Sequence, residues 1–366
     1  MMKPLTLLFL LTLPLFSHAT ERCGQRLAEG KNDPVCLRDS YRQPIAQWPR
    51  PQVEGQVAWQ EMAPARPVDL PASLPYPLLK LGIRLFFDPA LSASGKIACA
   101  SCHRPEHAYA DTLPVTPGHQ GRMGRRNAPA LIGVRDVHEL FWDGRAGNLE
   151  QQALGPLADP AEMATDLAAL PARLAAIPGY AGEFAAAWGD AEITLARIQA
   201  TLAAYQRTLT PERTAFDAFL EGDAGALDDQ QLLGLHLFRT KARCMTCHSG
   251  PALSDNQFHN LGLTYFGRRK YEDLGRYEVT GRNEDVGKFK TPTLRNVARS
   301  GPWMHNGLFP SLRGILNAYN AGMFRPKPAN AAQAADPRFP VSSPLLKPLD
   351  LSADEIAALE AFLKTL

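Results

Sequence analysis

Cys99-Ala-Ser-Cys102-His103 and Cys244-Met-Thr-Cys247-His248 are the two stretches that decide how this chain of 366 residues is organised. Two cysteines at this spacing can add across the two vinyl groups of one porphyrin, and the adjacent histidine then lies under the iron as its fifth ligand. A single copy could instead be half of a zinc site or a thiol redox pair. Two copies, with no second cysteine pair in either half, favour two covalently attached c-type haems.

The residues that precede the two motifs resemble each other. Leu81-Gly82-Ile83-Arg84-Leu85-Phe86 stands before the first motif and Leu233-Gly234-Leu235-His236-Leu237-Phe238 before the second. Each stretch predicts a helix that leads into a haem-binding loop. We therefore expect two related haem domains, an N-terminal one over 71–215 and a C-terminal one over 216–366.

Apolar residues recur at helical spacing along most of the chain, and no run alternates as a strand would. Helices are predicted over 76–87, 166–177, 180–188, 193–209, 228–238, 312–319 and 352–366. The last begins with Ser352-Ala-Asp-Glu355, which has the form of a capping box. The predicted fold class is mostly α: two c-type cytochrome-like haem domains packed together, preceded by an irregular N-terminal arm over 20–70.

The first nineteen residues have the pattern of an export signal. Lys3 provides a positive start, an apolar run follows over 5–16, and Ser17-His18-Ala19 is a small-x-small cleavage site. The apolar run is short for a membrane span, although an uncleaved anchor is the alternative. We expect cleavage near Ala19 and a soluble protein in the periplasm, without a membrane span.

Composition and the remaining cysteines agree with an exported globular protein. The chain is 45% hydrophobic and 21% charged, and its formal charge of +2 gives no field that suggests nucleic acid. Cys23 and Cys36 are left over in the arm, where an oxidising compartment favours a local disulfide. No neighbouring residue supports a redox role for them.

Several further stretches resemble the bacterial di-haem cytochrome c peroxidases and their MauG-like relatives. They extend over roughly 76–366 and leave the arm outside. Their order and spacing are specific, and they are Leu85-Phe86-Phe87-Asp88-Pro89, Gly118-His119, Arg126-Asn127-Ala128-Pro129, Phe141-Trp142-Asp143-Gly144-Arg145, Gly155-Pro156, Asp273-Leu274-Gly275-Arg276 and Lys290-Thr291-Pro292-Thr293-Leu294-Arg295-Asn296.

The resemblance implies that hydrogen peroxide reacts at the haem of His103. It matches His119 to a distal histidine ligand that leaves the iron on activation, and Gln152 and Glu162 to the distal-pocket pair. A carboxylate above the iron can move a proton from the inner to the outer oxygen of peroxide. Taken alone, His119 would be an ordinary loop residue and Glu162 an acid in the first turn of a helix.

Two further roles follow from the resemblance. Trp142 matches a tryptophan between the two haems that can relay an electron, although an aromatic at a domain interface is also ordinary packing. Asn127, with the backbone carbonyls of Ser300 and Pro302, matches a calcium site, and oxygen ligands suit calcium. Ser300 replaces the usual threonine.

The sixth ligand of the C-terminal haem departs from the peroxidases. They have methionine fourteen residues after the histidine that matches His305, whereas this chain has Tyr319, as MauG-like enzymes do. Phenolate favours ferric iron, whereas a thioether favours ferrous iron. Met323, four residues later on the same predicted helical face, and Met304 are the alternatives. Ala242 departs from the MauG-like enzymes, which have a tryptophan there to draw electrons from a partner.

Three functions follow, in order of preference. The first is a periplasmic di-haem peroxidase that reduces hydrogen peroxide to water with electrons from a small cytochrome c or cupredoxin. The second is a MauG-like enzyme that uses peroxide to oxidise side chains of a protein substrate. The third is a di-haem electron-transfer protein, which would have no use for a proton-transfer group such as Glu162. Assembly into a homodimer is left open.

Overall fold

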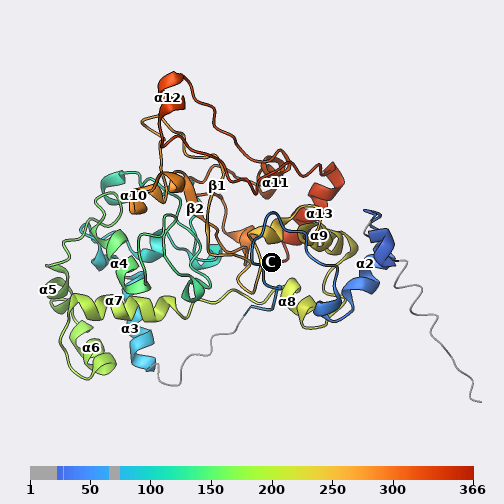
Figure 1. The fold of residues 1–366 in the computed structure, drawn as a ribbon. Coiled ribbons are helices and arrows are strands. Elements are labelled where there is room, and N and C mark those ends of the chain that lie inside the picture. Colours follow the sequence, from blue (N-terminus) through green and yellow to red (C-terminus); the bar gives the residue numbers. More distant parts are fainter. Residues whose placement is uncertain (1–22, 28, 66–74) are drawn as a thin grey trace, which may run out of the picture.

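The computed structural model describes residues 23–27, 29–65 and 75–366, and the predicted export signal over 1–19 lies outside them (Figure 1). Helices predominate, which confirms the mostly α-helical prediction. Short 3-10 turns lie in the loops, at 45–47, 89–91, 99–101, 105–107, 119–121, 134–136, 244–246, 283–285 and 297–299. No helix in the described part of the chain is long and apolar enough to cross a membrane.

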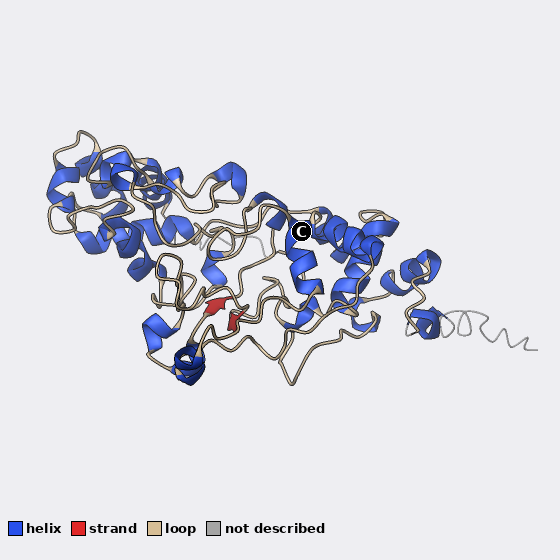
Figure 2. Ribbon diagram, turned by 90° about the horizontal axis from the view of Figure 1, so that it is seen from above, coloured by secondary structure: helices blue, strands red, loops and turns tan. Residues whose placement is uncertain are grey.

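Two short strands also occur, although the sequence predicted none. β1 (Phe258–Asn260) and β2 (Lys288–Lys290) pair antiparallel, with Phe258 opposite Lys290. Strands of three residues are too short to show an alternating pattern, which is why periodicity missed them. Figure 2 shows the strands near the middle of the molecule, with helices gathered at its two ends.

The N-terminal half contains one group of helices around its own core. The group consists of α3 (Tyr76–Phe87), α4 (Leu149–Ala158), α5 (Leu170–Ala175), α6 (Tyr180–Trp188) and α7 (Leu195–Gln206). α7 packs against both α3 and α4, and buried side chains such as Leu85, Phe184 and Ile198 fill the space between the helices. The bounds of α3 and α6 are as predicted. α4 was missed because Gly155-Pro156 lies within it, and both residues are poor helix formers.

The C-terminal half has a second, separate core. Its helices are α8 (Ala215–Leu220), α9 (Asp229–Arg239), α10 (Tyr277–Thr280), α11 (Leu312–Asn320), α12 (Ala331–Ala335) and α13 (Ala353–Leu363). α13 lies along α9, and Phe216, Phe238 and Phe362 are buried there. Ser352 caps α13 in the predicted capping box with Glu355, which confirms that part of the prediction.

A glycine in each half explains the repeated sequence before the two motifs. A Cβ on Gly82 of α3 would lie 2.8 Å from the carbonyl oxygen of Thr201 on α7. A Cβ on Gly234 of α9 would lie 2.1 Å from the carbonyl oxygen of Ala358 on α13. Each glycine therefore lets the helix before a Cys-x-x-Cys-His loop approach a partner helix closely.

The N-terminal arm is less irregular than predicted. It contains α2 (Pro34–Tyr41), which Asp33 caps, and α2 packs against α9. The predicted disulfide between Cys23 and Cys36 is confirmed. Leu37, Tyr41, Trp48 and Met62 are buried in the core of the C-terminal half. The prediction of an irregular arm was wrong for this part, because eight residues with weak amphipathicity gave no helical signal.

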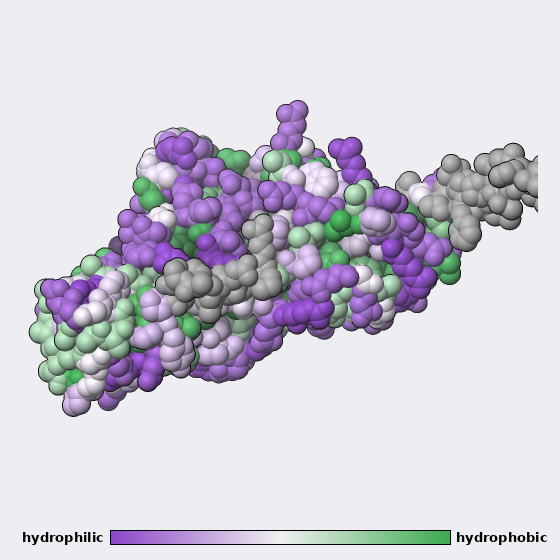
Figure 3. Space-filling model, turned by 90° about the horizontal axis from the view of Figure 1, so that it is seen from below, coloured by the Kyte–Doolittle hydropathy of each residue, from purple (hydrophilic) through white to green (hydrophobic). Residues whose placement is uncertain are grey.

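The face of the molecule drawn in Figure 3 is predominantly hydrophilic, and its apolar residues are scattered over it. Single exposed apolar side chains are normal on soluble proteins.

Candidate functional site

Both Cys-x-x-Cys-His motifs line the same cavity, which has a volume of about 810 Å³. The N-terminal half contributes Cys99, Cys102 and His103, and the C-terminal half contributes the corresponding three residues, Cys244, Cys247 and His248. None of the four cysteines forms a disulfide, so all four thiols are available for thioether bonds. Two motifs 145 residues apart in the sequence thus open onto one interior space.

The two motif histidines are oriented in the same way. His103 Nδ1 lies 2.9 Å from the carbonyl oxygen of Tyr109, and His248 Nδ1 lies 2.9 Å from the carbonyl oxygen of Leu253. Because a carbonyl only accepts, each Nδ1 carries the proton and each Nε2 is left to bind a metal. Burial lowers the pKa of both histidines, which favours the neutral form that a metal needs. Both sets of residues therefore fit a haem c.

Gln152 and Glu162 come together on the N-terminal side of the cavity. Gln152 lies on α4 and Glu162 in the turn after that helix, and both line the cavity with His103. No helix begins at Glu162, so the structure does not support the alternative of a first-turn helix acid. Burial raises the pKa of Glu162, Asp159 raises it further, and Arg145 opposes the shift. The site thus holds one carboxyl group that binds its proton more tightly than usual.

His119 lies beside Glu162 but is not among the residues that line the cavity. Its backbone N–H donates to the carbonyl oxygen of Glu162 at 2.8 Å. The approach requires Gly118, because a Cβ there would lie 2.0 Å from the carbonyl oxygen of Ala161. His119 Nδ1 is buried without a hydrogen-bond partner among the described residues. An unsatisfied buried nitrogen is costly and is consistent with a missing ligand partner.

Trp142 lines the cavity between the two halves and is held by both. Its indole N–H donates to the carbonyl oxygen of Asn127 at 2.9 Å. Its own carbonyl accepts from the backbone N–H of Lys290 in β2 at 2.8 Å, and the backbone N–H of Asn127 donates to the carbonyl of His305 at 2.7 Å. These bonds fix the indole where the two halves meet.

The residues predicted to bind calcium belong to the lining of the same cavity. Asn127, Ser300 and Pro302 all line the cavity, and the Asn127 amide N–H₂ donates to the carbonyl of Leu113 at 3.1 Å. That hydrogen bond uses the amide nitrogen of Asn127 and not its oxygen Oδ1, which is the atom that would bind calcium. The calcium site stays a prediction.

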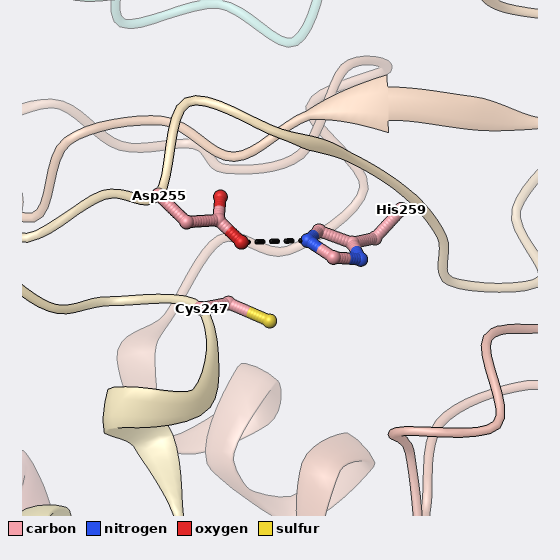
Figure 4. Close-up of side chains that lie close together, drawn as sticks. All are labelled: Cys247, Asp255 and His259. Carbon is pink, nitrogen blue, oxygen red and sulfur yellow. Dashed lines mark hydrogen bonds and ion pairs between the residues drawn. The ribbon is translucent and has the colours of Figure 1, made fainter. Parts of the chain in front are cut away.

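A different cluster of possible metal ligands occurs next to the second motif. Cys247, Asp255 and His259 approach one another, and His259 Nε2 lies 2.8 Å from a carboxylate oxygen of Asp255 (Figure 4). Cys247 belongs to the second Cys-x-x-Cys-His motif, whose sulfurs are the predicted points of haem attachment. The cluster therefore overlaps the predicted haem site and is not assigned to a separate metal.

Tyr319 on α11, the predicted sixth ligand, lines the cavity with Cys247 and His248. Met304 also lines the cavity, whereas Met323 does not. The expectation that Met323 shares a helical face with Tyr319 was wrong. α11 ends at Asn320, and Met323 has a left-handed backbone with φ of +59°.

Charged residues at the junction of the halves were not assigned roles from the sequence. The Arg126 guanidinium donates to Asp143 at 2.5 Å and to both carboxylate oxygens of Asp273 at 2.8 Å. The Lys290 ammonium donates to the carbonyls of His138 at 2.6 Å and Asn256 at 3.1 Å. Arg126, Asp143, Asp273 and Lys290 stand in the stretches that carry the family resemblance. That resemblance was the signal in the sequence that could have pointed to them. Loop charges have no periodicity that would reveal partners so far away in sequence.

Comparisons with known proteins agree with this geometry. A family model described as di-haem cytochrome c peroxidase matches residues 77–225. Cytochrome c551 peroxidase of Nitrosomonas europaea is 36% identical over 230 residues, which are 63% of this chain and 69% of that protein. Methylamine utilization protein MauG of Methylophilus methylotrophus is 37% identical, over 72% of this chain and 81% of that protein. The crystal structure of a MauG-like protein associated with microbial copper homeostasis has a TM-score of 0.71 and 32% identity, covering 86% of this chain and 95% of that one.

Proposed function

Because the chain belongs to the family of di-haem cytochrome c peroxidases and MauG proteins, we propose that it reduces hydrogen peroxide to water at the haem of His103. The observation that carries the proposal is that Glu162 and Gln152 line the same cavity as His103. An electron carrier would need no ionisable group there, whereas peroxide reduction needs a proton to be moved. Reduction of one peroxide consumes two electrons and two protons and gives two waters.

The proposed architecture is two haem domains, over 71–215 and 216–366, each with one haem held by its two cysteines and its histidine. The two separate hydrophobic cores, one in each half, support this division. Residues 1–19 are proposed to direct export to the periplasm, with cleavage near Ala19. The disulfide between Cys23 and Cys36 supports an oxidising compartment.

When bound, the haem of His103 supplies an iron site that accepts peroxide and exchanges electrons with it. With the haem in place, Glu162 would accept one proton of the peroxide and return it to the oxygen that leaves as water. The raised pKa of Glu162 helps, because a proton shuttle works best when its pKa is near the working pH. Gln152 would orient the peroxide by hydrogen bonding, and His119 would hold the iron in the resting protein and give way to peroxide on activation.

The second half delivers electrons to the first. Trp142 is proposed to relay them, since it lies at the junction of the halves and its indole orientation is fixed by Asn127. Asn127, Ser300 and Pro302 are proposed to bind one calcium ion that stabilises this junction. Tyr319 is proposed as the sixth ligand of the haem on His248.

A second candidate function is MauG-like oxidation of a partner protein, and Tyr319 is the observation that favours it. A phenolate ligand stabilises ferric iron and makes the second haem a poor store for one electron. Ala242 stands where MauG-like enzymes have a tryptophan, and it has no aromatic ring through which a protein substrate could donate electrons. It is also buried, so a partner protein could not contact it. Peroxide reduction with a small redox protein therefore remains the first proposal.

The test uses the exported holoprotein. Pyridine haemochrome analysis and intact mass should give two haems per chain, and peroxide consumption should be followed with a reduced cytochrome c or cupredoxin as donor. We expect one peroxide consumed for every two electrons. One haem per chain, bound zinc, or no peroxide-dependent oxidation of any donor would contradict the proposal.

A further inference from the structure

Two segments of the C-terminal half, 262–272 and 323–347, pack together into what we call the basic lobe. Phe266 and Phe339 have ring centroids 5.5 Å apart. A Cβ on Gly267 would lie 2.3 Å from the side-chain nitrogen of Gln333. The lobe is anchored on β1, where the backbone N–H of Ser343 donates to the carbonyl of Asn260 at 2.9 Å. Figure 1 shows α12, which belongs to this lobe, standing away from the rest of the molecule.

The basic lobe concentrates positive charge. Its two segments contain seven cationic residues and two acids, a formal +5, whereas the whole chain carries only +2 and the remaining residues therefore sum to −3. The cationic residues are Arg268, Arg269, Lys270, Arg325, Lys327, Arg338 and Lys347. A cluster of one sign in a chain that is otherwise net negative creates a local field.

Most of this charge is not neutralised within the protein. Arg338 pairs with Asp336 at 2.9 Å and Lys347 with Glu54 at 2.5 Å. Arg268, Arg269, Lys270 and Lys327 are exposed, and no carboxylate of the described residues forms an ion pair with them. Four unpaired cations thus face solvent on a single lobe.

Exposed apolar side chains accompany the cations. Val341 is 81% exposed, Tyr271 61% and Phe324 41%. A small apolar area with charged groups around it is the usual composition of a protein–protein interface. The lobe therefore has the composition of a contact surface and not only that of a solvated loop.

Part of the lobe lines the cavity that the second haem motif also lines. Ser343, Leu345 and Leu346 line the cavity together with Tyr319 and Cys247. The same segment therefore carries the exposed Val341 and also forms part of the cavity lining. A protein bound to the outer side would lie close to the second haem, the one through which electrons are proposed to enter.

We propose that the basic lobe docks the electron donor, and that this donor is a small redox protein with carboxylates around its exposed cofactor edge. The inference rests on the proposed peroxidase function and adds the chemistry of the partner and its place of binding. Complementary charge speeds encounter by about 10- to 10³-fold at low ionic strength and is screened by salt. Anionic lipid would also attract cations, but the cavity on the inner side of the lobe favours a redox protein.

The experiment compares two charge-reversed holoproteins. Arg268, Arg269 and Lys270 are each changed to Glu in the test variant. Arg42, Arg50 and Lys80, which are exposed and have no ion pair among the described residues, are changed to Glu in the control. Both variants lose the same amount of positive charge. A reduced acidic cupredoxin is the probe, and its dissociation constant and its rate of peroxide-dependent oxidation are measured at low and at near-physiological ionic strength.

We expect the test variant to lose about 10-fold or more in both binding and oxidation rate at low salt, and the control to stay within about twofold. The salt dependence should flatten in the test variant alone. Equal losses in the two variants, or unchanged binding in the test variant, would overturn the proposal.

Two further measurements separate the possible failures. Peroxide turnover with a small-molecule dye as donor should be the same in wild type and both variants. If wild type does not oxidise the dye, the proposed peroxidase function is wrong. The dissociation constants of the cupredoxin still test whether the basic lobe is the docking surface. If the test variant loses binding to vesicles containing phosphatidylglycerol but keeps its cupredoxin reaction, the lobe is a lipid contact and the proposal is wrong.

Discussion

The two haem-binding loops are alike on one side and different on the other. In both, a histidine Nδ1 donates to a backbone carbonyl at 2.9 Å, and a glycine in the preceding helix permits close packing with a partner helix. The other neighbours of the two motifs differ: Glu162 lies close to Cys99 and Cys102, whereas Tyr319 lies close to Cys247 and Cys244. The geometry of the motif is therefore common to the two halves, and the side chains around it differ in their chemistry.

This difference separates two tasks. An ionisable carboxyl group with a raised pKa can transfer protons during peroxide cleavage. A half-buried tyrosine that lines the cavity with Cys247 can instead occupy a coordination position and set a reduction potential. Each of the following predictions changes one side of the comparison and leaves the other intact.

The largest expected effect is on the reduction potential of the second haem. Tyr319→Met should raise one of the two potentials by on the order of 0.2 V, because a thioether favours ferrous iron. The ferric variant should also gain the near-infrared thioether-to-iron band, which the wild type should lack. Spectroelectrochemistry measures both. Met323→Leu is the matched control and should change neither, since Met323 lies beyond the end of α11. A thioether band in wild type that Met323→Leu abolishes would make Tyr319 only a packed aromatic.

Glu162→Gln should slow the reaction with peroxide by about 10²-fold or more, because the amide keeps the shape but cannot transfer a proton. Stopped-flow mixing with peroxide measures the rate, and haem content should not change. Glu150→Gln on α4 removes a carboxyl group that forms an ion pair with Arg207 instead, and should leave the rate unchanged. Near-normal reaction in Glu162→Gln would remove this residue from the mechanism.

The glycines before the two loops should differ in their effect on stability. Gly234→Ala should lower the free energy of unfolding by about 3 kcal/mol, because its new methyl group meets a backbone carbonyl that cannot move easily. Gly82→Ala meets the corresponding atom at a longer distance and should cost about 1 kcal/mol. Chemical denaturation measures both. Gly182 of α6 has free space, so Gly182→Ala should not destabilise. Equal costs at Gly82 and Gly234 would contradict the packing argument.

The smallest expected effect is on the pH dependence of the peroxide reaction. Glu162 must be ionised to accept the first proton, so the rate should fall as pH drops through its raised pKa. Asp159→Asn removes a charge that raises this pKa and should move the acid limb to lower pH. Arg145→Gln removes a charge that lowers it and should move the limb to higher pH. Each shift should be roughly half a pH unit. Shifts in the same direction in both variants would assign the limb to another group.

The sequence predicted the parts of this comparison that local patterns determine. The cysteine spacing defined both loops, and apolar periodicity gave α3, α6 and the capped start of α13. The resemblance placed His119 and Glu162 at the same haem, but their backbone hydrogen bond could not be predicted, because it depends on a loop that Gly118 allows to pack against a distant turn. The sequence also could not show that Met323 stays outside the cavity lining, since this depends on where α11 ends.

The arm shows the same limit at a larger scale. Its residues give little periodic signal, yet Tyr41 hydrogen bonds to His236 of α9 at 3.0 Å, and Arg239 pairs with Glu61 at 2.5 Å. These contacts join residues far apart in sequence, and neither partner reveals the other. The basic lobe also arises only when two loops 50 residues apart are brought together.

The division of labour between the two loops can be tested by keeping one haem at a time. One variant replaces Cys99 and Cys102 with Ser, and the other replaces Cys244 and Cys247 with Ser. Intact mass and circular dichroism establish that each folded variant holds one haem. Peroxide is then mixed rapidly with each reduced protein. The account predicts that the variant retaining the haem of His103 reacts with peroxide, and that the variant retaining only the haem of His248 does not. A fast peroxide reaction at the haem of His248 alone would contradict it.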